Sequence, residues 1–271
     1  MARSSKLPTY LIVLFVMGYM GYSWLTGPGP VPTAPPAPAS PPPAASMGAA
    51  GQPGYALNPS NAWPPVANAG SAQGLAPDLF SVNYYVVLDG SGSMNESDCS
   101  EGKRKIEVAR TALSAFARSV PAQANLGLAV FDRRGLSERL PLGQDNRDGF
   151  SQAVERVQVS ANTPLKSAVE LAYSRLLDQG RRQLGYGEYH LVIVTDGLAS
   201  PSQKPTSAVN RILAESPVVF HTIGFCIGER HSLNQPGRTY YRSANNPQAL
   251  QQGLETVLAE APDFAVSQFG D

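Results

Sequence analysis

The feature that most constrains this chain is the alternation of short apolar segments with amphipathic segments from Val82 onward. The apolar segments are rich in β-branched and aromatic residues, as expected of strands buried on both faces. The amphipathic segments repeat their apolar residues at helical spacing. Strands are expected at residues 82–89, 125–131, 136–140, 190–195, 218–225 and 239–242, and helices at 106–120, 148–157, 164–179, 207–215 and 247–261. This alternation predicts an α/β fold with a doubly wound, mostly parallel central sheet and helices on both faces.

The N-terminal part of the chain has a different character. Arg3 and Lys6 precede an uncharged apolar run at residues 7–26. A helix of that length would span a hydrocarbon core of about 30 Å. We therefore expect a transmembrane signal anchor, with residues 1–6 in the cytoplasm because the flanking positive charges precede the run. A cleaved signal peptide is the alternative, but its apolar region is usually shorter, and the proline that follows here discourages cleavage.

Residues 27–77 are rich in proline, alanine and glycine and contain no charged side chain. Such a composition predicts a disordered linker that acts as a semi-rigid spacer. A globular domain is then expected at residues 78–262 and a C-terminal tail at 263–271. The charge asymmetry predicts a single-pass protein of the inner (cell) membrane whose domain lies on the periplasmic or extracellular side.

Charge and cysteine content exclude several classes of protein. Acidic and basic residues balance at 21 each, so no net field favours nucleic acid, and no nucleic-acid partner is expected. Cys99 and Cys226 form no CxxC pair, which excludes a zinc ribbon and a thioredoxin-like motif. Both should follow strands at the same end of the sheet, where they are either a candidate disulfide or two free thiols.

Other candidate groups have simpler interpretations. The three histidines are scattered in the sequence, which argues against a histidine-based metal cluster. His221 lies in mid-strand and is interpreted as a hydrogen-bonded core or interface residue. The basic stretch Lys103–Lys105 is interpreted as a solvated first helical turn. Two arginine pairs are interpreted as exposed loop charges: Arg133-Arg134 and Arg181-Arg182.

Three turns carry hydroxyl and carboxylate side chains. Asp89, Ser91 and Ser93 follow the first strand, Thr163 precedes a helix, and Asp196 follows a central strand. In a doubly wound sheet such turns converge at the carboxyl ends of the strands, where ligands bind. Two carboxylates and three hydroxyls are hard oxygen donors, which suit Mg²⁺, Mn²⁺ or Ca²⁺ and are poor ligands for zinc or copper.

The motifs DGSGS, NTPL and VTDG resemble those of the von Willebrand factor A and integrin I-domain family, and the resemblance covers about residues 80–260. It implies a complete metal-ion-dependent adhesion site (MIDAS) made of the five residues named above. In the family the three hydroxyl side chains coordinate the ion, and the two aspartates often act through water. One coordination position stays open for an Asp or Glu of a partner protein. The acidic loop at residues 95–102 is longer than the family's usual short turn.

The resemblance implies a membrane-tethered, non-catalytic module for adhesion or scaffolding. No nucleophile–base arrangement, phosphate-binding loop or dinucleotide fingerprint occurs, so no enzymatic activity is expected. Two alternatives remain: a subunit that cooperates with a MoxR-type AAA+ ATPase in complex assembly, and a surface or pilus adhesin. Asp89→Ala is expected to abolish partner binding and leave the fold intact, because the site should lie on a rim outside the core.

Overall fold

The computed structural model describes residues 63–65, 74–159 and 162–259. The expected cytoplasmic N-terminus, signal anchor and C-terminal tail lie outside these residues, as does most of the expected linker. Within the described ranges, no helix has the length and apolar character needed to cross a membrane.

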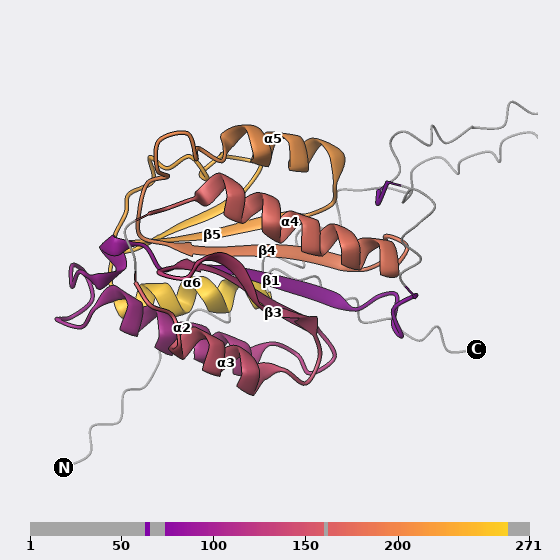
Figure 1. The fold of residues 1–271 in the computed structure, drawn as a ribbon, viewed down its shortest axis with the longest axis horizontal. Helices are drawn as coiled ribbons and strands as arrows, with labels where there is room; N and C mark the ends of the chain where they lie inside the picture. The colour runs from indigo at the N-terminus through magenta and orange to yellow at the C-terminus, as the bar shows by residue number, and fades with distance from the viewer. Residues whose placement is uncertain (1–62, 66–73, 160–161, 260–271) are drawn as a thin grey trace, which may run out of the picture. The chain divides into compact units, whose positions relative to one another are not determined.

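One sheet organises the domain, with its strands in the order β3-β2-β1-β4-β5-β6 (Figure 1). The strands are β1 Val82–Asp89, β2 Asn125–Asp132, β3 Gly135–Gly143, β4 Glu188–Thr195, β5 Val219–Phe225 and β6 Tyr240–Ala244. Neighbouring strands run parallel except β2 and β3, which are antiparallel. The predicted mostly parallel sheet is therefore confirmed, with β3 as its antiparallel edge.

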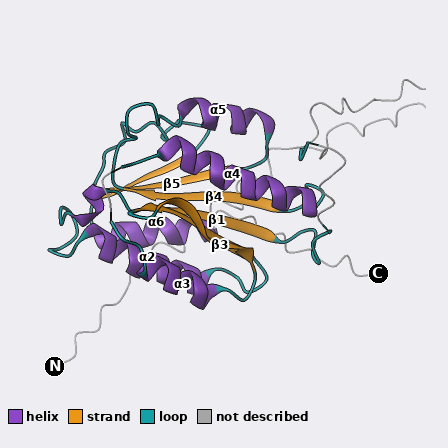
Figure 2. Ribbon diagram, viewed as in Figure 1, coloured by secondary structure: helices purple, strands orange, loops and turns teal. Residues whose placement is uncertain are grey.

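Helices cover both faces of this sheet (Figure 2). They are α2 Lys105–Ser119, α3 Arg147–Glu155, α4 Leu165–Arg182, α5 Thr206–Glu215 and α6 Pro247–Ala259, with a short 3₁₀ turn, η2, at Gly92–Asn95. Helices α2, α3 and α6 pack on one face, and α4 and α5 pack on the other. Two hydrophobic cores result, one on each side of the sheet.

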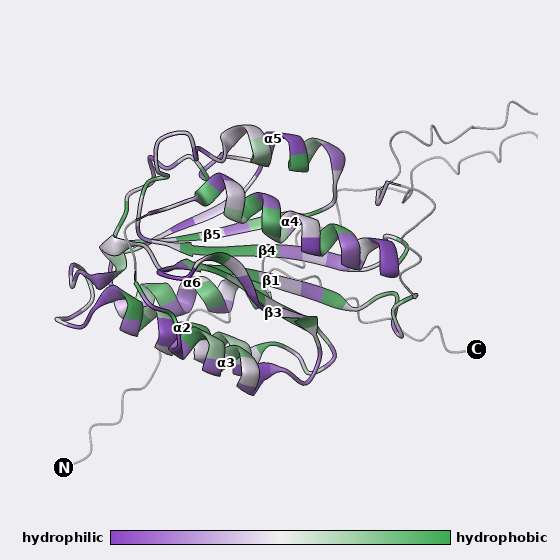
Figure 3. Ribbon diagram, in the orientation of Figure 1, coloured by the Kyte–Doolittle hydropathy of each residue, from purple (hydrophilic) through white to green (hydrophobic). Residues whose placement is uncertain are grey.

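The sequence of β1 explains why this strand lies in the middle of the sheet. Its VNYYVVLD run has no exposed position, so both of its faces can be apolar without contact with water. Tyr84, Val86 and Leu88 enter the core beneath α2, whereas Tyr85 and Val87 enter the core beneath α4. The hydropathy colouring shows much of the apolar green in the central strands, whereas the helices alternate between green and purple along their length (Figure 3).

Two stretches assigned to the linker contact the domain. The Trp63 ring lies 4.6 Å, centroid to centroid, from the ring of Tyr189 in an edge-on arrangement. The Trp63 indole N–H also donates to the Tyr173 hydroxyl at 3.4 Å. Further along, the Ala76 N–H donates to the Arg182 carbonyl at 2.8 Å. The packed unit thus includes residues before position 78.

The end of α4 differs from its prediction. The helix continues to Arg182, so Arg181 and Arg182 lie in its last turn and not in a loop. Basic side chains there interact favourably with the negative end of the helix dipole. Arg181 also forms a 3.0 Å ion pair with Asp178, one turn earlier in the helix.

The strand order places a topological switch point between β1 and β4. The chain moves from β1 to β2 in one direction, and later inserts β4 on the other side of β1. The loops that leave β1 and β4 therefore diverge to opposite faces, and in doubly wound sheets ligands bind at the carboxyl ends of the strands at such a point. Asp89 to Ser93 and Asp196 lie at this switch point.

Candidate metal site at the carboxyl ends of β1 and β4

The loop after β1 holds the first three candidate ligands. Asp89 ends the strand with its side chain fully buried, and its Oδ1 accepts a 2.7 Å hydrogen bond from the Ser91 N–H. Gly90 lies so close to β2 that a Cβ there would come within 2.8 Å of the Phe131 carbonyl oxygen. Gly90, the first glycine of DGSGS, is therefore required by packing, because only a residue without a side chain lets the loop turn so close to β2.

Hydrogen bonds join this loop to the end of β4. The hydroxyls of Ser91 and Ser93 are 3.1 Å apart, and Ser93 Oγ donates to Asp196 Oδ1 at 2.7 Å. Thr195, the last residue of β4, donates to Asp89 Oδ2 at 2.5 Å. Two loops separated by about a hundred residues thus share one hydrogen-bond network.

Thr163 approaches from a third loop, just before α4. Its N–H donates to the Ser200 hydroxyl at 3.0 Å, and its carbonyl accepts from the Ser200 N–H at 3.0 Å. These bonds hold the threonine beside the loop after β4. A Cβ on Gly197 would lie 3.4 Å from Ser93 Oγ and 3.9 Å from Thr163 Oγ1. Ser93 and Thr163 therefore lie beside Gly197, and hydrogen bonds link Ser93 to Ser91 and Asp196, and Asp89 to the end of β4. We refer to the five predicted residues together as the rim.

Burial governs the electrostatics of the rim. Burial raises the pKa of Asp89 to about 6, against the lowering effect of its hydrogen bonds from Ser91 and Thr195. Burial likewise raises the pKa of Asp196, whereas Ser93 and Lys105 stabilise its charged form. The expectation that Asp89 lies outside the core was wrong, because the carboxylate is enclosed where β1 and β4 meet.

Lys105 also departs from its predicted role. The side chain is only 4% exposed, and Nζ lies 3.2 Å from Asp196 Oδ2. Burial by itself would lower the pKa of Lys105, but the hydrogen bond and the charge attraction with Asp196, together with Glu96, raise it above its ordinary value. The solvated interpretation of Lys103–Lys105 fails at this residue, because it occupies the inner face of α2 with Ile106 and Ala109.

The donor set of the rim fits a hard divalent cation. It offers two carboxylates and three hydroxyls on converging loops, which matches Mg²⁺, Mn²⁺ or Ca²⁺ and not a soft metal. Among the residues that the structure describes, no three His, Cys, Asp or Glu side chains group so as to hold a metal.

A groove of about 530 Å³ opens beside the rim, between the loop after β1 and the segment that follows α3. Two arginines line it. Arg104 pairs with Glu107 at 2.6 Å, and Arg110 donates to the Val157 carbonyl at 2.6 Å. The groove is lined by Gly92, Asn95, Arg104, Ile106, Arg110, Val157, Gln158 and Val159. Arg110 also has an acidic partner, Glu155 at 4.0 Å, so the charges of both arginines are balanced.

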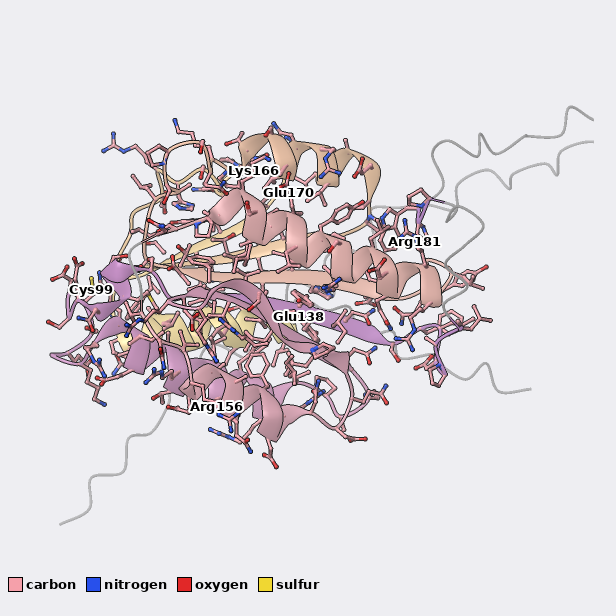
Figure 4. All side chains as sticks on the ribbon, in the orientation of Figure 1. Cys99, Glu138, Arg156, Lys166, Glu170 and Arg181 are labelled. Atoms are coloured by element: carbon pink, nitrogen blue, oxygen red, sulfur yellow. The ribbon has the colours of Figure 1, made fainter. Side chains whose placement is uncertain are left out.

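The two cysteines are neighbours at the same end of the sheet, as predicted. Both are free thiols in the structure, and Cys226 Sγ donates to the Asp98 carbonyl at 2.8 Å. Burial and a hydrogen bond with Cys99 raise the pKa of Cys226 to about 12. Figure 4 labels Cys99 at the rim end of the molecule and Arg181 at the opposite end. Formation of a disulfide between these cysteines stays a prediction.

The histidines are less scattered in space than in sequence. His190 and His221 lie side by side in the core with 3.1 Å between His190 Nδ1 and His221 Nε2, so the core interpretation of His221 is confirmed. His231 reaches the rim, with its Nε2 3.1 Å from the Gly197 carbonyl oxygen. The sequence carried no signal for either contact, since both join segments at least thirty residues apart.

Comparisons with known proteins agree with this architecture. Residues 84–198 match the family model of the von Willebrand factor type A domain. A Bacillus subtilis (strain 168) protein, YwmD, is 24% identical over 195 residues, which are 64% of this chain and 83% of YwmD.

Two solved structures share the fold. BatB from Bacteroides thetaiotaomicron has a TM-score of 0.51 at 15% identity, covering 66% of this chain and 100% of BatB. The manganese-loaded TRAP protein of Plasmodium vivax has a TM-score of 0.50 at 18% identity, covering 65% of this chain and 73% of TRAP. The likeness to these structures shows a shared fold, and the sequence match to the von Willebrand factor type A model covers residues 84–198 of that fold.

Proposed function

We propose that this domain is a non-catalytic protein-binding module that uses a divalent cation at the rim to capture an acidic residue of a partner protein. The observation that carries the proposal is the meeting of Asp89, Ser91, Ser93, Thr163 and Asp196 from three separate loops. Von Willebrand factor type A domains are typically interaction modules without enzymatic activity, and no enzyme-specific family is indicated.

The residues of the rim would divide the work. Ser91, Ser93 and Thr163 offer neutral oxygens, whereas Asp89 and Asp196 are held by hydrogen bonds that fix their carboxylates behind those hydroxyls. When bound, a cation such as Mg²⁺ or Mn²⁺ supplies a positive centre to which a partner carboxylate can bind. The groove beside the rim, lined in part by Arg104 and Arg110, offers room for partner residues next to that carboxylate.

We further propose that the domain works outside the cytoplasm, tethered to the membrane by residues 7–26. The support is the position of Arg3 and Lys6 before the apolar run. A C-terminal reporter that is active only in the cytoplasm should give no signal. A strong signal would reverse the orientation and favour an ATP-driven partner in the cytoplasm.

Mn²⁺ binding by the purified full-length protein tests the site directly. Asp89→Asn should weaken the affinity roughly 10–100-fold, the usual cost of disturbing a group that positions metal ligands. Asp132→Asn is a matched control. Asp132 is also a buried aspartate at the end of a strand, but its oxygens accept from Arg139, Arg134 and Gln158. Its loss should leave the Mn²⁺ affinity unchanged.

Partner capture tests the function itself. Crosslinking in native membranes, followed by mass spectrometry, should trap a partner with the wild-type protein. Capture should be lost with Asp89→Asn and with the wild-type protein in chelator, and it should survive Asp132→Asn. Equal capture in all four samples would show that the binding surface lies elsewhere.

A further inference from the structure

Lys105 is a buried cation placed directly against the candidate metal site. Its Nζ lies 3.2 Å from Asp196 Oδ2 and 3.2 Å from Glu96 Oε2, with Asp98 Oδ2 at 3.8 Å. Glu96 and Asp98 are 59% and 75% exposed, so water screens their charges. The Asp196 side chain is fully buried. The pair with Asp196 is therefore the strongest of the three contacts.

The backbone fixes the lysine in this position. Lys105 is the first residue of α2, and its N–H donates to the Glu96 carbonyl at 2.8 Å. A basic side chain is unfavourable at the positive end of a helix dipole, so the helix itself does not account for a lysine here. The contacts with the carboxylates of the loop and of Asp196 offset that cost.

Each oxygen of the Asp196 carboxylate accepts one hydrogen bond. Oδ1 accepts from Ser93 and Oδ2 accepts from Lys105. A carboxylate bound on both sides is held in one orientation, and its charge is partly cancelled by the ammonium group.

We propose that Lys105 acts as a built-in cation of the rim, which weakens the binding of the divalent ion and strengthens the capture of the partner's carboxylate. The inference rests on the proposed function and adds the residue that tunes it. A fixed positive charge beside a ligand carboxylate repels a second cation and reduces the charge that Asp196 can offer to it. The same positive charge attracts an incoming carboxylate.

A purely structural role for Lys105 predicts a different pattern. If the lysine only holds the loop that contains Glu96 and Asp98, its loss would loosen the rim. Metal binding and carboxylate binding would then weaken together. The electrostatic role instead requires the two affinities to move in opposite directions, so the pair of measurements separates the two roles.

The first measurement is the Mn²⁺ dissociation constant of purified full-length variants, followed by electron paramagnetic resonance. Lys105→Met keeps the length of the buried side chain and removes its charge, and it should bind Mn²⁺ about tenfold more tightly. Lys105→Arg keeps the charge and should stay within about twofold of the wild type. Lys103→Met removes an exposed charge two residues away and serves as the matched control, with no expected change.

The second measurement uses acetate as the carboxylate probe at saturating Mn²⁺. Water proton relaxation reports the water molecules bound to Mn²⁺, and acetate should displace one of them. Lys105→Met should need several-fold more acetate for half-displacement than the wild type, and Lys103→Met should need the same amount.

The outcomes distinguish this inference from the proposed function. A wild-type protein that binds no Mn²⁺ would overturn both. Wild-type binding together with unchanged or weaker Mn²⁺ affinity in Lys105→Met would overturn only the role of Lys105. If Lys105→Met does not fold, Lys105→Gln provides the neutral variant, and a thermal melt establishes that each protein compared is folded.

Discussion

The two ends of the central sheet handle buried polar groups in opposite ways. At the carboxyl ends of the strands, the rim encloses two carboxylates, Asp89 and Asp196. At the other end, which we call the base, Asn83 and Gln183 are fully buried but neutral. Asn83 Nδ2 lies 2.7 Å from Gln183 Oε1, 2.8 Å from the Glu188 carbonyl and 2.9 Å from the Ser81 carbonyl. This network at the base therefore satisfies the Asn83 and Gln183 side chains without charge.

This difference suits the base to stabilising the fold and the rim to binding a cation. A neutral, fully hydrogen-bonded network costs little to bury and helps to fix the register of the strands. A buried carboxylate whose pKa is raised is destabilising in its charged form. Retaining Asp89 at the rim makes physical sense if a cation recovers that cost on binding. The base should then tolerate substitution poorly, and the metal-free rim should tolerate it well.

The largest expected effect is at the base. Asn83→Ala removes the donor to the Gln183 and Glu188 oxygens and the acceptor of the Asn125 amide, which donates to Asn83 Oδ1 at 2.9 Å. The Ser81 carbonyl keeps its 2.9 Å hydrogen bond from Gln183 Nε2. At about 1–3 kcal/mol for each buried group left unsatisfied, with partial relaxation, the free energy of unfolding should fall by on the order of 4 kcal/mol. Urea denaturation of the metal-free protein measures it.

Two further variants sharpen this comparison. Asn245→Ala removes an exposed asparagine and should change the free energy of unfolding by less than about 0.5 kcal/mol. Asp89→Asn at the rim should leave the metal-free protein as stable as the wild type or more so, because it removes a buried charge. A loss at the rim as large as that at Asn83 would break the contrast between the two ends.

A smaller effect is expected in the pH dependence of stability. The buried histidines should make stability rise with pH, whereas Asp89 at the rim should make it fall. Burial lowers the pKa of His190 to about 4 and that of His221 to about 3. Between those values and the unfolded value near 6.5, the unfolded state binds more protons. The stability that the histidines contribute is thus present above pH 6.5 and is lost as the pH falls.

The contribution of Asp89 to stability changes with pH in the opposite direction. Its folded pKa of about 6 exceeds the unfolded value of 3.8, so the folded state binds more protons between these values. The contribution of Asp89 is greatest below pH 4 and is lost as the pH rises through 6, by roughly 3 kcal/mol in total.

Denaturation of the metal-free protein between pH 4.5 and 6.5 tests both signs. Asp89→Asn should make stability rise more steeply with pH, by up to about 1.4 kcal/mol per pH unit. His190→Asn should make the rise shallower. Adding saturating Mg²⁺ to the wild type should mimic Asp89→Asn, because a bound cation keeps the carboxylate charged. An unchanged slope in Asp89→Asn would show that its burial carries no proton linkage.

The predictability of the fold also differs between regions. The strands and helices were predictable because the spacing of apolar residues within each segment indicates which of its faces is buried. The bounds of β1 were predicted as observed. The five rim residues were predictable because each lies at a strand end or before a helix, and parallel strands bring such positions together. The residue types at these positions predict a hard divalent cation, and that part stays a prediction. Neither inference required knowledge of a contact between distant side chains.

The contacts that were missed depend on packing between elements. The pairing of His190 with His221 requires the register of β4 with β5, which the sequence does not contain. The sequence does indicate the burial of Lys105, because this residue lies three and four positions before Val108 and Ala109, which face the core from α2. The solvated interpretation followed from the positive charge of the lysine and disregarded that helical spacing. Trp63 left no such signal, because it stands alone in a proline-rich segment.

The smallest effect concerns Trp63, which packs at the base against Gly180 of α4. A Cβ on Gly180 would overlap the six-membered ring of Trp63. Gly180→Ala should therefore displace the tryptophan and lower the free energy of unfolding by about 1 kcal/mol, and Trp63→Ala should lower it by about 1–2 kcal/mol because the ring is only partly buried. Chemical denaturation measures both, and Trp63 fluorescence should shift to longer wavelength in Gly180→Ala.

The double variant decides whether one contact explains both losses. Without the tryptophan ring, alanine at position 180 meets no obstacle from it, and alanine is favoured over glycine inside a helix by about 1 kcal/mol. Gly180→Ala should therefore destabilise the wild type and stabilise the Trp63→Ala protein. The Mn²⁺ affinity should stay constant across all four proteins, since the rim and the base are held by separate contacts. Because α4 runs from Leu165, beside Thr163, to the base at Gly180, a changed affinity would mean that this helix couples the two ends.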